Sequence, residues 1–198
     1  MIHSLRQRRK QMLEAEILDA ARSLLAEKGY AAMSMDELAA QVGISKPTLY
    51  SHFTTKDDII VATMVREMEH FLALIESEGE DQTPLQRLIF VLRKFMRVQE
   101  AKSMGTQPWT PELFQLICAR EEGINSIRRI DAAIIALIQA GIAAGEIDPS
   151  LDPPTIASAF YALSHALKHT HFTRSGPNHP AAADMLTKLF ERGVRAAE

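Results

Sequence analysis

The sequence predicts an all-α protein, because helix start and stop signals recur along the chain without strand alternation or hairpin signals. A start signal pairs a capping side chain with Glu or Gln three residues later, as in Ser34 with Glu37, or with Pro at the first helical position, as in Thr83-Pro84. Glycine follows several such segments, where helices commonly end. Joining starts to stops predicts about nine helices, near residues 8–28, 35–42, 46–53, 56–78, 84–104, 111–122, 126–144, 153–172 and 180–196.

The first three predicted helices occupy residues 1–55, which we take as the first domain. Leu13 and Ile17 lie on one face of the first helix and give it a side to bury. The second helix ends at Gly43, and Ser45 begins the third as its cap. A tight turn containing glycine between two short helices is typical of a helix-turn-helix.

The third predicted helix, residues 46–53, has only about two turns and is too short to add much to a core. Leu49 and Phe53 share its inner side. The side chains able to donate hydrogen bonds are Lys46, Thr48, Tyr50, Ser51 and His52. A helix with such a surface fits the major groove of DNA, which is about 12 Å wide. A helical corner whose exposed residues are merely polar is the alternative that this pattern leaves open.

The remaining helices are longer and form the second predicted domain, residues 56–198. Thr54, Thr55 and Lys56 cap the fourth helix directly after the third, so no flexible linker separates the two domains. Further start signals stand at Thr110-Pro111, Asp152-Pro153 and, more weakly, His179-Pro180, and the expected glycine stops are Gly29, Gly79, Gly105, Gly123 and Gly145.

Overall composition does not point to a nucleic-acid partner, since the 198 residues carry a net charge of −3 at pH 7. A local exception is the basic run that precedes any acid, formed by Arg6, Arg8, Arg9 and Lys10. These cations can follow a phosphate backbone, or they can belong to a solvated, disordered tail. The sequence alone favours neither reading.

Cys118 is the only cysteine, so no disulfide can form within the chain, which suits a reducing compartment. Its apolar neighbours favour a buried thiol over a reactive one. No apolar segment of a secretory signal follows the basic run, and uncharged runs stop at about 14 residues, short of the roughly 18 to 20 that span a bilayer. The predicted location is the cytoplasm.

The run SMDELAAQVGISKPTLYSHFTTKDDII, residues 34–60, resembles the DNA-binding segment of the TetR family of transcriptional regulators. Lys28-Gly29-Tyr30 matches the "KGY" near which the first helix of that family ends, and the close similarity covers roughly residues 10–62. The resemblance implies a homodimeric regulator, usually a repressor, that releases its operator DNA when a small molecule enters the larger domain.

The resemblance also implies roles for individual residues. Carried over by position, the phosphate contacts are Ser34, Tyr50, His52 and Lys56, and the residues at or near base edges are Ser45, Lys46, Pro47, Thr48 and Ser51. Pro47 departs from the Gly or Ala often seen there in the family. It removes a backbone donor and adds an apolar surface suited to a thymine methyl, which puts the operator sequence in doubt but not the fold.

In this family an effector pocket usually lies among the fourth to eighth helices. The residues that we predict to line it are Met68, Phe71, Met96, Trp109, Phe114, Cys118 and Tyr161. Methionines and aromatic residues at helical spacing are core residues more often than pocket residues, so each has that alternative. No buried charge stands out, which favours an apolar or aromatic effector.

The resemblance further implies that the last two helices, near 153–172 and 180–196, form a four-helix bundle with a partner subunit. The apolar stripe for this contact is Ala182, Met185, Leu186 and Leu189.

Two other classes of function stay open. His165 and His169 lie four residues apart on one predicted helical face, as in a metal sensor, but no nearby carboxylate completes a ligand set. A position at the dimer surface or in the pocket wall explains them as well. The other class is a helical small-molecule-binding protein or enzyme without operator recognition. The sequence lacks a Gly-rich phosphate loop, a nucleophile elbow and a zinc-protease motif, so we predict no catalytic residue, metal or cofactor.

Overall fold

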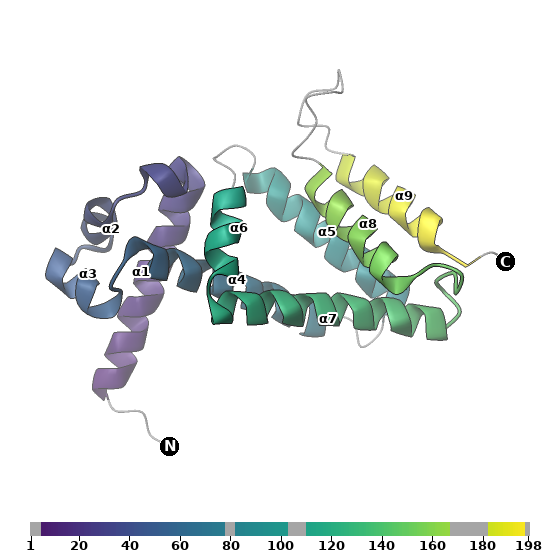
Figure 1. The fold of residues 1–198 in the computed structure, drawn as a ribbon, viewed down its shortest axis with the longest axis horizontal. Helices are drawn as coiled ribbons and strands as arrows, with labels where there is room; N and C mark the ends of the chain where they lie inside the picture. The colour runs from purple at the N-terminus through teal and green to yellow at the C-terminus, as the bar shows by residue number, and fades with distance from the viewer. Residues whose placement is uncertain (1–4, 78–81, 103–109, 167–181, 197–198) are drawn as a thin grey trace. The chain divides into compact units, whose positions relative to one another are not determined.

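The computed structural model describes residues 5–77, 82–102, 110–166 and 182–196, and these segments form an all-α fold, as predicted. The helices (Figure 1) are α1 Leu5–Ala32, α2 Met35–Val42, α3 Lys46–His52, α4 Lys56–Ser77, α5 Pro84–Lys102, α6 Pro111–Cys118, α7 Glu121–Ala143, α8 Pro153–Ala166 and α9 Ala182–Val194. Within the described segments, one isolated antiparallel bridge joins Ile147 to Arg195. None of the helices described has a stretch long and apolar enough to cross a membrane.

The chain divides into two compact units by its internal contacts. The first comprises Met1–Glu69 and Gly105–Ser126, and the second comprises His70–Met104 and Ile127–Glu198. Both α4 and α7 therefore contribute residues to each unit. The division at residue 55 into a DNA-binding and an effector-binding part concerns function, and it remains a prediction.

The predicted caps of the first unit are confirmed. The side-chain hydroxyls of Ser34, Ser45 and Thr55 accept the backbone N–H three residues later, at 3.2, 3.2 and 3.1 Å. Gly43 ends α2 in the left-handed conformation, with φ 78° and ψ 30°, as its place between two helices predicted. Gly29 also has a positive φ, but its ψ of 170° is extended, so the left-handed cap predicted there is wrong. The chain kinks at Gly29 instead, and helical structure continues to Ala32.

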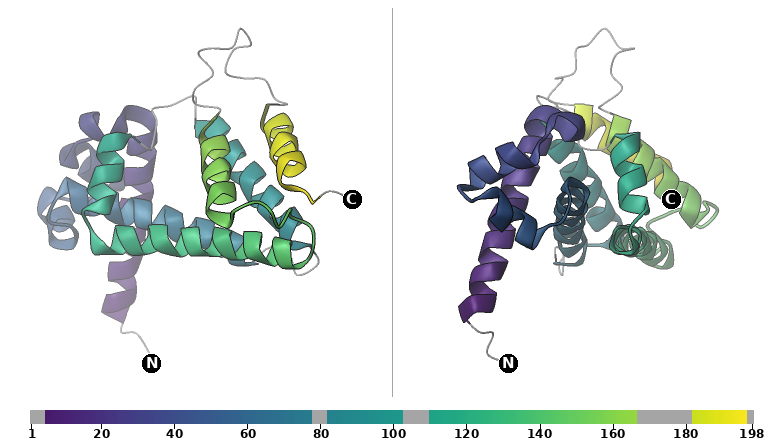
Figure 2. Two further views of the ribbon diagram at one scale, coloured as in Figure 1. Left: turned by 45° about the vertical axis from the view of Figure 1, so that its right-hand side comes forward. Right: turned by 60° about the vertical axis from the view of Figure 1, so that its left-hand side comes forward.

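Apolar side chains from four helices hold the first unit together. Ile17 and Leu24 of α1, Leu38 of α2, Leu49 of α3 and Ile60 of α4 are all buried. Figures 1 and 2 show α2 and α3 beside α1 in every view. The predicted apolar face of α1 is confirmed, α2 packs on α1, and α3 packs in turn on α2.

The later start signals are also confirmed where they can be seen. Thr110 accepts the N–H of Leu113 at 3.3 Å, and the Asp152 carboxylate accepts the N–H of Thr155 at 3.1 Å. Thr83 and Gln86 form a reciprocal pair, because each side chain accepts the backbone N–H of the other. The weaker signal at His179-Pro180 and the glycine stops at Gly79 and Gly105 lie outside the described residues.

The boundary between α6 and α7 was predicted wrongly. The sequence predicts helices over 111–122 and 126–144 with Gly123 as the stop, whereas α6 ends at Cys118 and α7 begins at Glu121. Gly123 lies buried inside α7, where a Cβ atom would come within 2.3 Å of the carbonyl oxygen of Ile117. This glycine therefore permits a close approach of two backbones, not a left-handed cap. Gly145, after α7, does have the positive φ expected of a stop, 72°.

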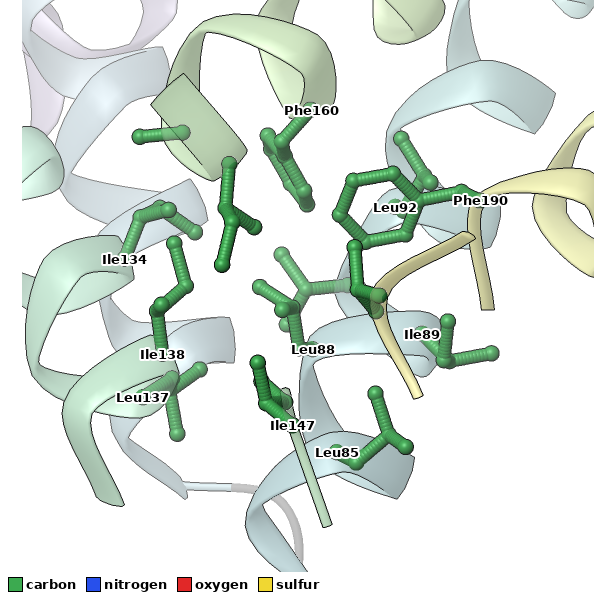
Figure 3. Packing of buried hydrophobic residues seen from close by; sticks show 14 of the residues in the cluster. Leu85, Leu88, Ile89, Leu92, Ile134, Leu137, Ile138, Ile147, Phe160 and Phe190 are labelled. Atoms are coloured by element: carbon green, nitrogen blue, oxygen red, sulfur yellow. The ribbon is translucent and has the colours of Figure 1, made fainter. Parts of the chain in front are cut away.

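The second unit has an apolar core built from α5, α7, α8 and α9. Figure 3 shows Leu88 and Leu92 of α5 packed with Ile138 of α7, Phe160 of α8 and Phe190 of α9. Phe160 is fully buried, and its ring meets that of Phe190 edge to face with the centroids 6.2 Å apart. These contacts hold one side of α9 against α5 and α8.

Candidate nucleic-acid interface

Helix α3 is anchored from its inner side. Leu49 is fully buried, and the His52 ring, with 11% of its side chain exposed, has Nδ1 3.2 Å from the Glu14 carboxylate of α1. Phe53, which follows the helix, is half-buried and donates its backbone N–H to the Leu49 carbonyl. A helix of seven residues has little stability of its own, so burial of Leu49 and the contact of His52 with α1 determine where it lies.

The outer side of α3 carries the residues predicted to approach the bases. Ser45, Lys46, Pro47 and Ser51 are exposed, and Thr48 is half-buried. Tyr50, predicted to bind phosphate, has 50% of its surface exposed. This arrangement presents polar groups and the apolar Pro47 to solvent over the whole length of the helix. Contact with DNA itself remains a prediction for each of these residues.

Hydrogen bonds within the protein occupy part of this polar surface. The hydroxyls of Ser45 and Thr48 lie 2.7 Å apart, and the Ser51 hydroxyl donates to the Thr48 carbonyl at 2.7 Å. The Lys46 ammonium donates to the Asp36 carboxylate of α2 at 2.7 Å, with both side chains more than half exposed. An exposed pair of this kind contributes little to stability, so Lys46 can exchange Asp36 for another partner at small cost.

Lys56, predicted as a phosphate contact, also has a structural role that the sequence did not reveal. Its ammonium donates to the carbonyls of Tyr30 and Met33 at 2.8 and 3.2 Å and lies 4.2 Å from the centre of the Tyr30 ring. The Tyr30 hydroxyl in turn donates to the Asp57 carboxylate at 2.6 Å, which raises the pKa of Tyr30 to about 12. The last turn of α1 and the first turn of α4 are thereby joined. An ammonium has three N–H donors, so one stays available to Lys56 for a phosphate.

Ser34, another predicted phosphate contact, belongs to the cap of α2. Its hydroxyl lies 3.3 Å from the Glu37 carboxylate, which also accepts a hydrogen bond from Lys28 at 2.6 Å. The bond from Lys28 is the main reason why the pKa of Glu37 lies below its usual value. Ser34 is half-buried, and its hydroxyl already accepts the N–H of Glu37. Phosphate binding by Ser34 has to accommodate this cap.

The residues predicted for the effector pocket fall in both units. In the first unit, Met68 of α4 is buried, while Phe114 of α6 is 52% exposed. Cys118, at the end of α6, is half-buried, whereas its apolar neighbours predicted a buried thiol. Trp109 lies outside the described residues. The role of these side chains in binding an effector stays a prediction.

In the second unit, Met96 is fully buried, and its sulfur lies 3.8 Å from the Thr187 hydroxyl. Phe71 packs edge to face on Phe95, with the ring centroids 5.1 Å apart. The Tyr161 hydroxyl donates to the Asp131 carboxylate at 3.3 Å, and burial raises the pKa of Tyr161. Met96 is thus a core residue in this structure, which is the alternative that the sequence left open.

The metal alternative receives no test from the geometry. The side chain of His165 and the whole of His169 lie outside what the structure describes. Among the described residues, no group of three metal-ligating side chains comes together.

Helix α9 has an apolar surface outside the core. Met185 and Leu189 are 66% and 64% exposed, whereas Phe190 and Val194 on the other side are buried. Leu186, between the two sides, is half-buried and packs against the core. Met185 and Leu189, one turn apart, therefore form an apolar patch on the exposed face of this helix.

Comparisons with known proteins agree with the geometry of the first unit. Residues 17–63 match the family described as bacterial regulatory proteins, tetR family. The fatty acid metabolism regulator protein of Bacillus subtilis (strain 168) is 28% identical over 139 residues, which cover 69% of this chain and 72% of that protein. The HTH-type transcriptional repressor KstR of Mycobacterium tuberculosis is 27% identical over 142 residues, which cover 71% of this chain and 61% of that protein.

Among solved structures, the transcriptional regulator FadR from Bacillus subtilis in complex with stearoyl-CoA has the same fold. It superposes with a TM-score of 0.72 at 20% identity and covers 91% of this chain and 99% of that chain. The family match falls on the helices whose caps, turn and exposed α3 surface were described above. The chain therefore belongs to the TetR family and is a DNA-binding transcriptional regulator with its helix-turn-helix in α2 and α3.

Proposed function

We propose that this protein is a homodimeric repressor that binds a near-palindromic operator through α3 and releases it when a small, mainly apolar molecule binds. The observation that carries the proposal is α3 itself. Leu49 fixes the helix from inside, while Lys46 and Tyr50 stand exposed on its outside. A short helix with a polar outer surface fits a major groove about 12 Å wide. The DNA partner also supports the predicted cytoplasmic location, which remains part of this proposal.

If α3 lies in the major groove, the protein makes two kinds of contact with DNA. Residues assigned to phosphates position the protein but carry little sequence information, whereas residues at base edges select the sequence. Lys56 represents the first kind and Thr48 the second. Because phosphate contacts respond to salt and base contacts respond to sequence, the two assignments can be tested directly.

Thr48→Ala and Lys56→Ala should weaken DNA binding in different ways. Thr48→Ala should cost about 1–3 kcal/mol at particular operator positions and leave a scrambled duplex unaffected. Lys56→Ala should weaken both duplexes in proportion and lower the salt dependence by about 0.9 for each phosphate that the protein no longer neutralises. Fluorescence anisotropy over a salt series measures both, using an operator selected from DNA flanking the protein's own coding sequence.

The Lys56 variant needs a stability control, because its ammonium also donates to the Tyr30 and Met33 carbonyls. Melting temperatures of both variants separate unfolding of the protein from weaker phosphate binding. If Thr48→Ala weakens both duplexes equally while Lys56→Ala affects only the operator, the two assignments are reversed. If neither variant changes DNA binding, α3 is not the recognition helix.

For the effector, we propose a long-chain acyl compound as the first class to test. The Bacillus subtilis relative is named for fatty acid metabolism, and the similar FadR structure was solved with stearoyl-CoA. The predicted pocket residues, such as Met68 and Phe71, are apolar and adaptable, which suits an acyl chain. Repression is supported by the name of the KstR relative.

A true effector and the operator should weaken each other's binding by the same factor, since their coupling is reciprocal at equilibrium. Stearoyl-CoA is the probe, and coenzyme A without the acyl chain is its matched control. At about 100 times its dissociation constant, a ligand should stabilise the protein by about 2.7 kcal/mol, seen as a raised melting temperature. Unequal factors in paired titrations would contradict this coupling, and equal stabilisation by coenzyme A would contradict an acyl site.

Dimerisation through α8 and α9 is the last part of the proposal. The exposed Met185 and Leu189 support it, because a two-fold contact would remove both from water. A two-fold pair of recognition helices implies operator half-sites one or more helical turns apart.

A further inference from the structure

The first two turns of α1 carry several cations, at a place where positive charge does not stabilise a helix. The residues are Arg6, Arg8, Arg9 and Lys10, and the first turn holds no acid. Positive charge near the start of a helix is unfavourable, because the helix dipole is positive there. All of residues 5–12 are exposed, so these side chains also add little packing. Since the segment is helical from Leu5, the disordered tail that the sequence left open is wrong for this run.

Two of these cations continue the face of α1 that is buried in the first unit. Arg6, Lys10 and Ile17 follow at i, i+4 and i+11, which places them on one side of the helix. Ile17 is fully buried. Arg8, by contrast, is two residues from Arg6, or about 200° around the helix, and so lies on the opposite side.

This face leads directly to α3. Glu14 lies 3.2 Å from His52 of α3 and 3.7 Å from Lys10. Lys10 and Arg6 are four and eight residues before Glu14, or about 6 and 12 Å further along the helix axis. Figures 1 and 2 show these first turns of α1 continuing beyond the level of α3. Lys10 is 61% exposed, so its pair with Glu14 is weak and easily exchanged.

We propose that Arg6 and Lys10 form a second phosphate-binding surface, for the backbone of the same duplex whose major groove receives α3. The inference rests on the proposed function. Duplex DNA carries about one negative charge per 1.7 Å of axis, so a helix that extends past α3 meets further phosphates. Binding would also remove the unfavourable charge that these residues place at the start of α1.

Arg6→Ala and Arg8→Ala are a matched pair for the test, because each removes one exposed arginine from the same two turns. With a scrambled duplex as the probe, Arg6→Ala should lower the slope of log affinity against log salt by about 0.9 per phosphate, or about 1.8 for a dimer with both heads bound. Lys10→Ala should act like Arg6→Ala, and Arg8→Ala should leave the slope near that of the wild type. The melting temperature of Arg6→Ala should equal or exceed that of the wild type, since a structural role would lower it.

The outcomes separate this inference from the proposed function. A wild-type protein without salt-dependent affinity for any duplex would overturn both. If the wild type binds DNA but Arg6→Ala leaves the slope unchanged, the surface does not contact the backbone, and the proposed function stands without it. An equal fall in the slope for Arg6→Ala and Arg8→Ala would overturn the assignment of the contact to the side of α1 that carries Arg6 and Lys10.

Discussion

Leu189→Glu should convert the protein from dimer to monomer at micromolar concentration and remove most of its operator affinity. Leu189 is 64% exposed in the single chain, and our proposed dimer covers it. By two-fold symmetry, the substitution brings two unpaired carboxylates into the interface, and burying them costs far more free energy than covering the remaining apolar surface provides. We expect the dimer dissociation constant to rise roughly 100-fold or more, equivalent to about 2.8 kcal/mol. Sedimentation velocity and light scattering over a concentration series measure it.

Lys188→Glu is the matched control, because it places the same carboxylate on the neighbouring, charged side of α9. Leu186→Glu is a poorer test than Leu189→Glu, since Leu186 packs against the core and its loss would also destabilise the subunit. A Leu189→Glu protein that stays dimeric at micromolar concentration would show that the interface lies elsewhere.

Leu49→Ala should have the opposite consequence, unfolding the helix-turn-helix region of α1 to α3 while the dimer persists. Leu49 is fully buried and anchors a helix of only seven residues. Truncating a buried leucine to alanine costs about 2–5 kcal/mol, which is a large share of the free energy of unfolding of a small domain. Denaturant unfolding should show an early transition, and operator affinity should fall together with it. Size measurements should be unchanged.

Ser51→Ala on the exposed side of the same helix is the control for stability, and a surface change of this kind should stay within about 0.5 kcal/mol of the wild type. Normal operator affinity in Leu49→Ala would mean that α3 does not need its anchor, against the basis of our proposal. Loss of the dimer in that variant would argue against separate roles for the two surfaces.

Local chemistry could be predicted from the sequence because its cause lies within a few residues. Ser45 caps α3 and Asp152 caps α8 wherever those helices are placed. The left-handed conformation of Gly43 is likewise determined by the tight turn in which it lies. Gly123 looks like the same signal but is buried against Ile117, because its cause is a close contact between two helices. No pattern within a few residues of Gly123 separates these two reasons for a glycine.

The candidate site was predictable in outline for the same reason. The polar surface of α3 follows from helical geometry and the position of Leu49. Tyr30 and Met33, which accept hydrogen bonds from Lys56, precede it in the sequence by 26 and 23 positions. These bonds therefore depend on how α1 and α4 pack. The pocket prediction was the least constrained, since methionine serves a core as well as a cavity. Met96 proved to be a core residue, and only its neighbours in space could decide that.

The residues that hold α3 and the residues that it presents are different sets. Leu49 is buried and His52 contacts α1, while Lys46, Pro47 and Ser51 contribute nothing to the buried core. Evolution can therefore exchange the outer set without placing the fold at risk. A duplicated copy of this chain could acquire a new target sequence by a few substitutions on one side of one short helix.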